Sequence, residues 1–417
     1  MIVWLVTLSW AGSALAAQDA GPLAEGAIAQ VKGQAVVLGG SGQTRPAKVG
    51  EILRGGEIIE TKTDGQVRAI LVDKSVLEVR PNSRVQINDS RLNPRGVSSV
   101  LVYVGWIWTK VTARPGPDYA FEIEAPTTVA GVRGTELEAA VAEDGSARVG
   151  VSEGRAVMEN EEGSLSLGQG QSGEAGYKLA PVSKGSYSAS ADFWLKFLQA
   201  HHLAEFSEIE VFIVKVAAAL LDSRAELLKD DAEFRKDFQQ FERKHPKPVE
   251  QAPAAQPEKP SAKQAEEKPE AEALQERAAT ATELRQLFLK ARATQKAANR
   301  LGSNYYLAER ARAAVAGEPG RFSPAQAQTI SANLVKVKDV SQLHQQSRAT
   351  LNAVATVLEH QVGRYGVATT LGRAPSLERN AQIQQILRQI PGAMPAMPSP
   401  QSFPKPVMPA APRPRIP

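Results

Sequence analysis

The stretch that decides the fold is Ala-Pro-Thr-Thr-Val-Ala-Gly-Val-Arg-Gly-Thr, residues 125–135. Small and β-branched residues dominate it, and two glycines, Gly131 and Gly134, permit a tight bend. Short runs of this kind, separated by turn residues, are typical of strands. Because the neighbouring residues show the same pattern, the stretch lies inside an all-β region.

That region extends over residues 27–175, where short apolar runs alternate with turn residues. Val67, Ala69 and Leu71 alternate with polar neighbours, so one face of this strand is expected to be buried and the other wet. Asp144-Gly145 is the best hairpin signal, because a type I′ turn needs positive φ at both positions. We predict an all-β domain built as a sandwich, a jelly roll or a short β-solenoid.

One strand, over residues 100–111, is apolar on both faces and is therefore predicted to be central and covered on both sides. Strict alternation places its residues on two faces: Val100, Val102, Val104, Trp106 and Trp108 on one, and Leu101, Tyr103, Ile107 and Val111 on the other. We interpret Trp106 and Trp108 as core residues. The alternative is an aromatic platform for a sugar or a peptide.

Several short motifs occur in a fixed order around the opening stretch. They are Gly50-Glu51-Ile52-Leu53, Gly56-Glu57-Ile58-Ile59, Pro81-Asn82-Ser83, Val132-Arg133-Gly134-Thr135, Val149-Gly150-Val151-Ser152-Glu153-Gly154 and Leu167-Gly168-Gln169-Gly170-Gln171. With these motifs, residues 49–172 resemble the FecR domain, the periplasmic ferric-citrate regulator domain. One position departs from the family pattern, because Lys74 stands where a glycine usually makes the hairpin turn.

The resemblance implies a binding module, not an enzyme. The candidate positions that it supplies are Pro126, Gly131, Arg133, Gly134, Thr135, Glu153 and Gly154. The favoured role is structural, with Arg133 held by a carboxylate such as Glu153 or by backbone carbonyls, and Thr135 bonding the turn. The alternative leaves Arg133 exposed to grip a partner's carboxylate.

Residues 1–16 are predicted to be a signal peptide, cleaved after Ala16. An apolar run ends there in Ala14-Leu15-Ala16, the small-x-small pattern of a cleavage site. A membrane anchor is the competing interpretation, but a spanning helix needs about 20 apolar residues, and Asp19 interrupts the run. We expect a periplasmic or secreted, stand-alone FecR-domain protein without a cytoplasmic anti-sigma segment.

Helical patterns follow the β region. Over residues 188–245, a long helix from about 203 to 243 has a heptad seam that consists of Phe206, Ile213, Leu220, Leu227, Phe234 and Phe241. This seam needs a partner, which is either a second copy of the chain or another helix of the same chain.

The remaining sequence alternates between two compositions. Residues 246–271 are rich in Pro, Glu and Lys and are predicted to form a disordered linker. Residues 272–390 are predicted to be helical, with one helix starting at Ser323-Pro324 and running to about Val362. The Pro-rich tail, residues 391–417, is predicted to be disordered.

Composition limits the chemistry. The chain has no cysteine, which excludes disulfides, thiol catalysis and cysteine-bound zinc, and its five histidines lack metal-ligand spacing. No nucleotide-binding or hydrolase motif occurs, so we expect neither a cofactor nor an enzyme. The net charge of +4 is scattered, without the basic run of a nucleic-acid arm.

These patterns together predict a non-catalytic, secreted cell-envelope protein. Its β domain is expected to bind a protein or a cell-wall partner, while the helices oligomerise or display it. The alternatives are a membrane-anchored signalling regulator and a carbohydrate- or peptidoglycan-binding module.

Overall fold

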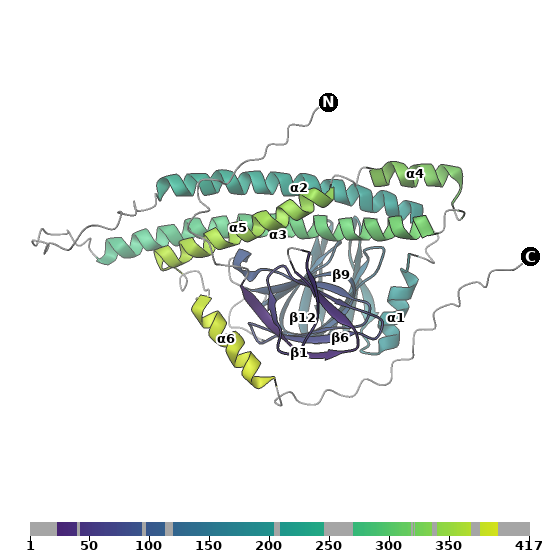
Figure 1. The fold of residues 1–417 in the computed structure, drawn as a ribbon, viewed down its shortest axis with the longest axis horizontal. Helices are drawn as coiled ribbons and strands as arrows, with labels where there is room; N and C mark the ends of the chain where they lie inside the picture. The colour runs from purple at the N-terminus through teal and green to yellow at the C-terminus, as the bar shows by residue number, and fades with distance from the viewer. Residues whose placement is uncertain are drawn as a thin grey trace, which may run out of the picture.

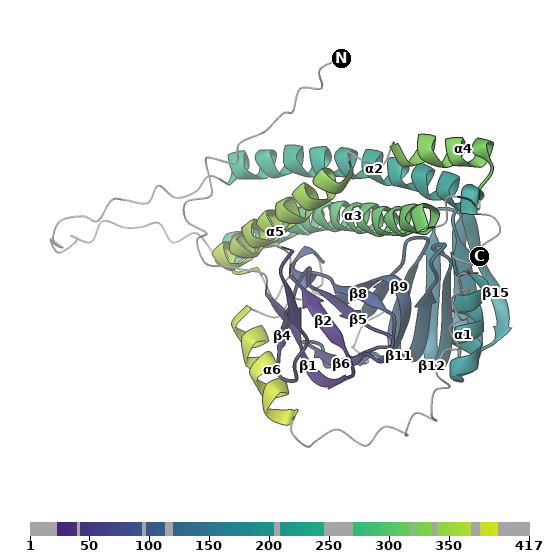
Figure 2. The ribbon, with the colours of Figure 1, turned by 45° about the vertical axis from the view of Figure 1, so that its right-hand side comes forward.

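The computed structural model describes residues 23–39, 42–93, 97–112, 120–203, 209–245, 270–317, 320, 322–335, 340–367 and 376–390. Within them, a β region is followed by helices (Figure 1). This order confirms the predicted fold class. The helices α2, α3 and α5 lie together over one side of the β region (Figure 2).

The β region contains fifteen strands among the described residues. They are β1 (Ala24–Lys32), β2 (Ala35–Leu38), β3 (Thr44–Pro46), β4 (Ile52–Arg54), β5 (Ile58–Thr61), β6 (Gln66–Leu71), β7 (Val76–Val79), β8 (Arg84–Ile87), β9 (Ser98–Lys110), β10 (Phe121–Glu124), β11 (Val129–Val141), β12 (Ala147–Asn160), β13 (Gly163–Gly168), β14 (Gln171–Gly176) and β15 (Leu179–Ser186). A short 3₁₀ helix, η2 (Ser90–Leu92), lies between β8 and β9.

All these strands belong to one branched sheet. Its main path runs β15-β14-β12-β11-β10-β9-β7-β6-β1-β4, and β2, β3, β5, β8 and β13 branch from it. The pairing is antiparallel everywhere except between β9 and β10. Branching lets the sheet fold over a single large core that draws residues from most of the strands.

Strand β9 is central and buried along most of its length, as predicted. The predicted assignment of its faces is wrong beyond Val104, because Ile107 and Val111 share the main core with Val100 and Val102. The cause is Gly105, whose φ of 102° interrupts the alternation. A side chain there is excluded, since a Cβ would lie 2.3 Å from the hydroxyl oxygen of Ser83.

Two β-turns differ in backbone conformation from what their sequences predict. Lys74 adopts a φ of 67° in the β6–β7 turn, so a lysine occupies the left-handed conformation that a glycine usually supplies. The Asp144-Gly145 turn joins β11 to β12, as expected of a hairpin signal. Only Gly145 has positive φ, however, and its N–H donates to the carbonyl of Ala142, so the turn is not type I′.

The helices of the described residues are α1 (Ala191–Ala200), α2 (Ile209–Lys244), α3 (Glu270–Gly317), α4 (Pro324–Val335), α5 (Val340–Tyr365) and α6 (Ser376–Gln389). Ser323 caps α4 as predicted, since the backbone N–H of Gln326 donates to its hydroxyl. The single helix expected from there to Val362 is wrong, because it is divided into α4 and α5.

The predicted heptad seam of α2 is buried within the chain. Ile213, Leu220, Leu227, Phe234 and Phe241 all join a core that α3 and α5 share. Ion pairs link Lys244 to Glu283, Asp237 to Lys290 and Glu226 to Arg300, so α2 and α3 run antiparallel. Of the two predicted partners for this seam, the helix of the same chain is the one present.

Two further helices cover flanks of the β region. Trp194 and Phe197 of α1 pack on Trp106 and Ala140. Ile383 and Ile386 of α6 pack on Ala27 and Val72. Both helices therefore pack directly on the β region.

Some predictions fall outside the described residues. They concern the signal peptide, Phe206, residues 246–269 of the linker and the tail 391–417; residues 270–271 of the predicted linker begin α3. No helix in the described part of the chain has the length and apolar character needed to span a membrane.

Candidate functional site

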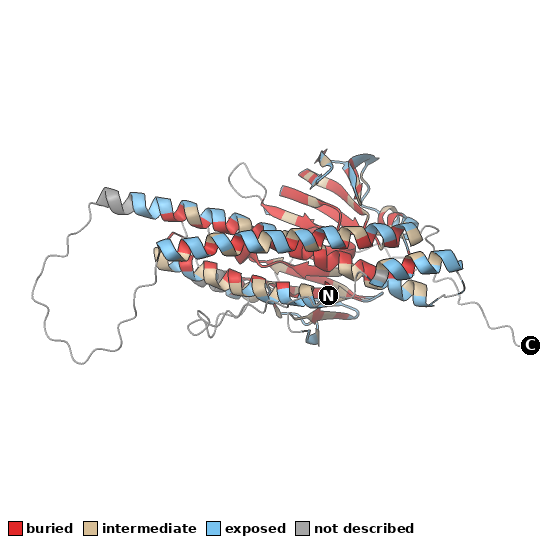
Figure 3. Cartoon of the chain, turned by 90° about the horizontal axis from the view of Figure 1, so that it is seen from above, coloured by how far each residue is buried: buried red, intermediate tan, exposed pale blue. Residues whose placement is uncertain are grey.

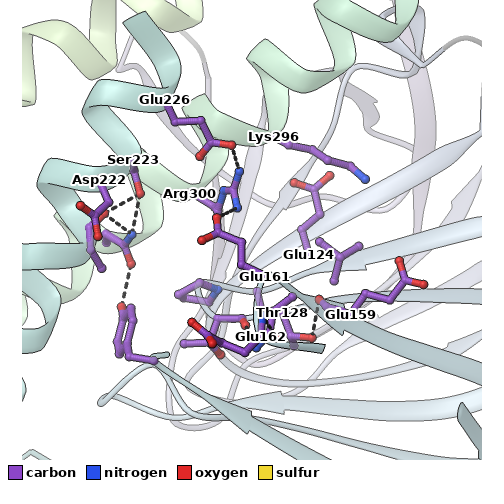
Figure 4. Close-up of a pocket in the computed structure, with 18 of the residues that line it drawn as sticks. Glu124, Thr128, Glu159, Glu161, Glu162, Asp222, Ser223, Glu226, Lys296 and Arg300 are labelled. Carbon is purple, nitrogen blue, oxygen red and sulfur yellow. Dashed lines mark hydrogen bonds and ion pairs between the residues drawn. The ribbon is translucent and has the colours of Figure 1, made fainter. Parts of the chain in front are cut away.

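A cleft of about 830 Å³ opens between one end of the β region and the helices α2 and α3 (Figure 4). Its β side is formed by the turn between β10 and β11 and by the β12–β13 hairpin, residues 159–162. Its helical side is formed by residues of α2 between Ala219 and Lys229 and residues of α3 between Lys296 and Asn304.

The opening stretch of the sequence analysis supplies part of the lining. Pro126 and Gly131, both candidate positions from the family motif, lie in the cleft wall. The turn beside them is rigid, because Thr127 donates to the carbonyl of Gly145 at 2.9 Å and Thr128 donates to that of Glu159 at 2.9 Å. The backbone therefore presents a fixed surface to the cleft.

Eleven of the twenty-five residues that line the cleft are charged, and acids outnumber bases. The acidic residues are Glu122, Glu124, Glu159, Glu161, Glu162, Asp222 and Glu226, and the basic ones are Lys178, Lys229, Lys296 and Arg300. Seven carboxylates face four cations in the lining, and Arg292 behind it pairs with Glu122 and Glu124, so a smaller acidic balance remains. Such a cleft favours a positively charged ligand.

Arg300 bridges the two sides of the cleft. Its guanidinium pairs with Glu226 of α2 and lies 3.2 Å from a carboxylate oxygen of Glu161 in the β12–β13 hairpin (Figure 4). Burial, together with the nearby Asp230 and Glu161, raises the pKa of Glu226 above its usual range despite Arg300. One arginine thus partly neutralises two acids.

Behind the cleft lies a buried polar network centred on Arg292 of α3. Its Nη2 lies 2.6 Å from Glu122 and 2.7 Å from Glu124, both on β10. Asn299 donates to Glu124 at 2.8 Å, and Lys296 lies 3.2 Å from Glu122. This network fastens α3 to the β region.

The charges in this network control the ionisation of Glu122. Burial alone would raise the pKa of its carboxyl, but the positive charges of Arg292 and Lys296 outweigh burial and lower it to about 2. Glu122 is therefore ionised over the whole physiological range. Its charge therefore pairs with those of Arg292 and Lys296 at neutral pH.

The other motif positions form a corner outside the cleft. Gly134 has a φ of 55° and Gly154 a φ of 87°, and a Cβ on Gly154 would lie 2.8 Å from the carbonyl oxygen of Gly134. The Thr135 hydroxyl is buried and donates to the carbonyl of Arg155 at 2.8 Å. These three residues hold β11 and β12 together across a bulge.

Arg133 and Glu153 are both exposed at this corner. Within the described part of the chain, the Arg133 guanidinium makes no hydrogen bond or ion pair to Glu153 or to any other carboxylate. Its side chain is therefore presented to solvent.

Replacing Arg133 with alanine should change the free energy of unfolding by less than about 0.5 kcal/mol, because an exposed side chain is removed. Thr135→Ala is the matched comparison at the same corner, and it should cost about 1–2 kcal/mol through its lost buried hydrogen bond. Urea denaturation measures both. A loss for Arg133→Ala as large as that for Thr135→Ala would contradict the exposed placement.

Trp106 and Trp108 differ in burial. Trp106 is 5% exposed and stacks on Trp194 of α1, with ring centroids 6.0 Å apart. Arg80 lies over its ring at 5.1 Å. Trp108 is half-buried. Because α1 covers Trp106, the two rings do not form an open platform.

The helical half of the cleft was not anticipated from the sequence. The contact of α3 with the β region does leave a signal, a polar stripe in which Arg292, Gln295, Asn299 and Ser303 recur at helical spacing and are all buried. Such a stripe is polar, so the periodicity of apolar residues does not indicate it. In the described part of the chain, no group of three or more His, Asp or Glu side chains is placed to hold a metal ion.

Comparisons with known proteins bear on the β region. Residues 57–157 match the FecR protein family model. The predicted resemblance is confirmed over these residues, which form about a quarter of the chain. They extend from β5 to β12 and include the whole corner and the β10–β11 turn of the cleft.

Two crystal structures of a putative anti-sigma factor from Parabacteroides distasonis ATCC 8503 also match. They are 16% and 15% identical, cover 33% of this chain and 63% and 64% of theirs, and each gives a TM-score of 0.29. This chain thus spans less than two thirds of their length. No curated protein matches.

Proposed function

We propose that this is a non-catalytic, exported protein of the cell envelope that binds a protein partner through the acidic cleft. The FecR match over residues 57–157 supports a role related to envelope signalling. A partner segment rich in Lys and Arg suits the charge balance of the lining. We favour such a segment over a sugar, because Trp106 is covered by Trp194 and leaves no aromatic platform.

The observation that carries this proposal is the position of the cleft. The FecR motif turn, which includes Pro126, forms one wall, and two helices from outside the matched segment form the other. A partner bound in the cleft would therefore contact both the β region and the helices α2 and α3. A partner that enters between them can shift α2 and α3 relative to β10, where the network of Arg292 lies.

A site-specific cross-link tests this proposal. A photoreactive benzoylphenylalanine in place of Glu162, which is exposed at the cleft rim, should capture a basic envelope protein in cell extracts. The charge reversals Glu161→Lys and Glu162→Lys should weaken binding of the captured partner at least about tenfold and reduce its salt dependence. Isothermal titration with the purified partner measures both effects.

Glu233 provides the control, because it is exposed on α2 but does not line the cleft. A benzoylphenylalanine at this position should capture no partner, and Glu233→Lys should leave the affinity unchanged. Equal capture at residues 162 and 233, or full affinity after the reversals at residues 161 and 162, would reject the cleft as the binding site.

A further inference from the structure

The cleft already holds one guanidinium group, which belongs to the chain itself. Arg300 of α3 lies between Glu226 of α2, with which it pairs, and Glu161 of the β12–β13 hairpin, from which it is 3.2 Å away (Figure 4). A guanidinium carries its N–H donors in a planar fork, and carboxylates match that fork. The chain's own arginine therefore shows that these two acids accept a guanidinium between them.

We propose that Glu161 and Glu226, which we call the guanidinium site, bind an arginine side chain of the partner, and that Arg300 competes for this site from within the chain. This inference rests on the proposed function, because it concerns the same cleft. It narrows the ligand from a basic segment in general to one that presents arginine. It also assigns to Arg300 the role of limiting the affinity of the free cleft.

The environment of Glu226 favours a bound cation. Its side chain is 34% exposed, and burial, together with the carboxylates of Asp230 and Glu161, raises its pKa above the usual range. All three effects disfavour the negative charge of Glu226. A cation beside Glu226 offsets them, so the site holds Arg300 when no partner supplies a cation.

The contact between Arg300 and the guanidinium site can be exchanged at little cost. The side chain of Glu161 is 80% exposed, and exposed ion pairs contribute little to stability. Arg300 is 34% exposed, so it can turn toward solvent without burying its charge. Its positive charge also acts on the carboxyl of Asp230, one turn beyond Glu226 on α2, which gives a displaced Arg300 a second acid nearby.

The guanidinium site is reached from the rim of the cleft. Seen from above, the helices lie across the middle of the β region, and the strands beneath them are largely buried (Figure 3). Glu161 and its neighbour Glu162, in contrast, are exposed in the hairpin that lines the cleft. An incoming side chain therefore meets the exposed Glu161 before the less exposed Glu226.

Isothermal titration of the full chain with a hexa-arginine peptide tests the competition. Arg300→Gln should bind the peptide about tenfold more tightly than the wild type, which corresponds to an internal competitor that occupies the site about nine-tenths of the time. Lys229→Gln is the matched control, because Lys229 lines the same cleft but makes no ion pair within the described part of the chain. Its loss removes one like charge without freeing an acid and should raise the affinity only about twofold.

A double-mutant cycle links the gain to Glu226. In a Glu226→Gln background, the acid that Arg300 covers is gone, so adding Arg300→Gln should change the affinity less than about twofold. The double variant leaves no half-buried charge without a partner and should keep the wild-type circular dichroism spectrum and unfolding midpoint. A tenfold gain in both backgrounds would show that Arg300 acts only through the overall charge of the cleft.

Hexa-lysine separates recognition of a guanidinium from attraction to positive charge. An ammonium group is a point charge and lacks the planar fork, so Arg300→Gln should raise the affinity for hexa-lysine less than about threefold. Equal gains for the two peptides would overturn the proposal. So would equal affinities of the wild type and Arg300→Gln for hexa-arginine, including no binding by either.

These outcomes are distinct from failure of the proposed function. Capture of a partner at residue 162 without any gain in Arg300→Gln would reject the internal competitor and leave the cleft as the binding site. A tenfold gain for hexa-arginine without capture of a protein would support the guanidinium site and count against a protein partner in the extract.

Discussion

Replacing Arg292 with methionine should lower the free energy of unfolding by about 3–5 kcal/mol, because the substitution leaves the buried Glu124 without its cation and Glu122 with Lys296 alone. Arg292 is 6% exposed, and its guanidinium donates to Glu122 at 2.6 Å and to Glu124 at 2.7 Å. Methionine fills most of the same volume, so the loss reports the charge and the hydrogen bonds more than a cavity. Urea denaturation followed by circular dichroism measures the change.

Arg312 is the matched control for this prediction. It lies on the same helix and pairs with Glu309 at 2.6 Å, but its side chain is 61% exposed. Arg312→Met should therefore leave the free energy of unfolding almost unchanged. Hydrogen exchange should also rise along α3 in Arg292→Met and not in Arg312→Met. Equal losses of stability in the two variants would show that the network does not fasten α3.

A second variant distinguishes the loss of the Arg292 ion pairs from a general loss of folded structure. Converting Glu124 to glutamine in the Arg292→Met background removes the charge that lost its cation. Part of the lost stability should return, because neutral amides tolerate burial better than unpaired carboxylates do. No recovery would mean that Arg292 acts through packing alone.

The β region was the most predictable part of the molecule. Alternation and turn residues identified strands such as β6, and the motif order identified the FecR resemblance. Alternation failed at Gly105, where a single residue with positive φ exchanges the two faces of β9. Such a bulge depends on Ser83, which lies opposite Gly105 in space and twenty-two positions away in the sequence.

The cleft was predictable only on its β side. Two of the candidate positions predicted from the family motif, Pro126 and Gly131, lie in its wall. The helical wall depends on the contact between Arg292 and Glu122, residues that are 170 positions apart. Local periodicity carries no information about which distant polar groups meet, so the return of α3 to the β region could not be inferred from the sequence.

Helix α2 illustrates the same limit. Its heptad seam was predicted from large residues such as Leu220 and Phe234, and the two candidate partners were indistinguishable by pattern. The structure gives that seam to α3 and α5.

Lowering the pH should weaken the attachment of α3 through Glu122. The folded-state pKa of its carboxyl is about 2, against 4.5 for the free side chain. A depressed pKa means that the stabilisation is complete above the unfolded value and is lost as the pH falls through the folded value. Protonation between about pH 4.5 and pH 2 should therefore remove about 3 kcal/mol.

Other carboxylates titrate in the same range, so the measurement is a difference between the wild type and Glu122→Gln. At neutral pH, the wild type should be more stable, because only the carboxylate faces Arg292 and Lys296 with a charge. The difference should shrink as the pH falls below about 4.5 and approach zero near pH 2. Glu309→Gln, which removes a more exposed partner of Arg312, should show almost no such change. A difference between wild type and Glu122→Gln that stays constant with pH would mean that the ionisation of Glu122 does not hold α3 on β10.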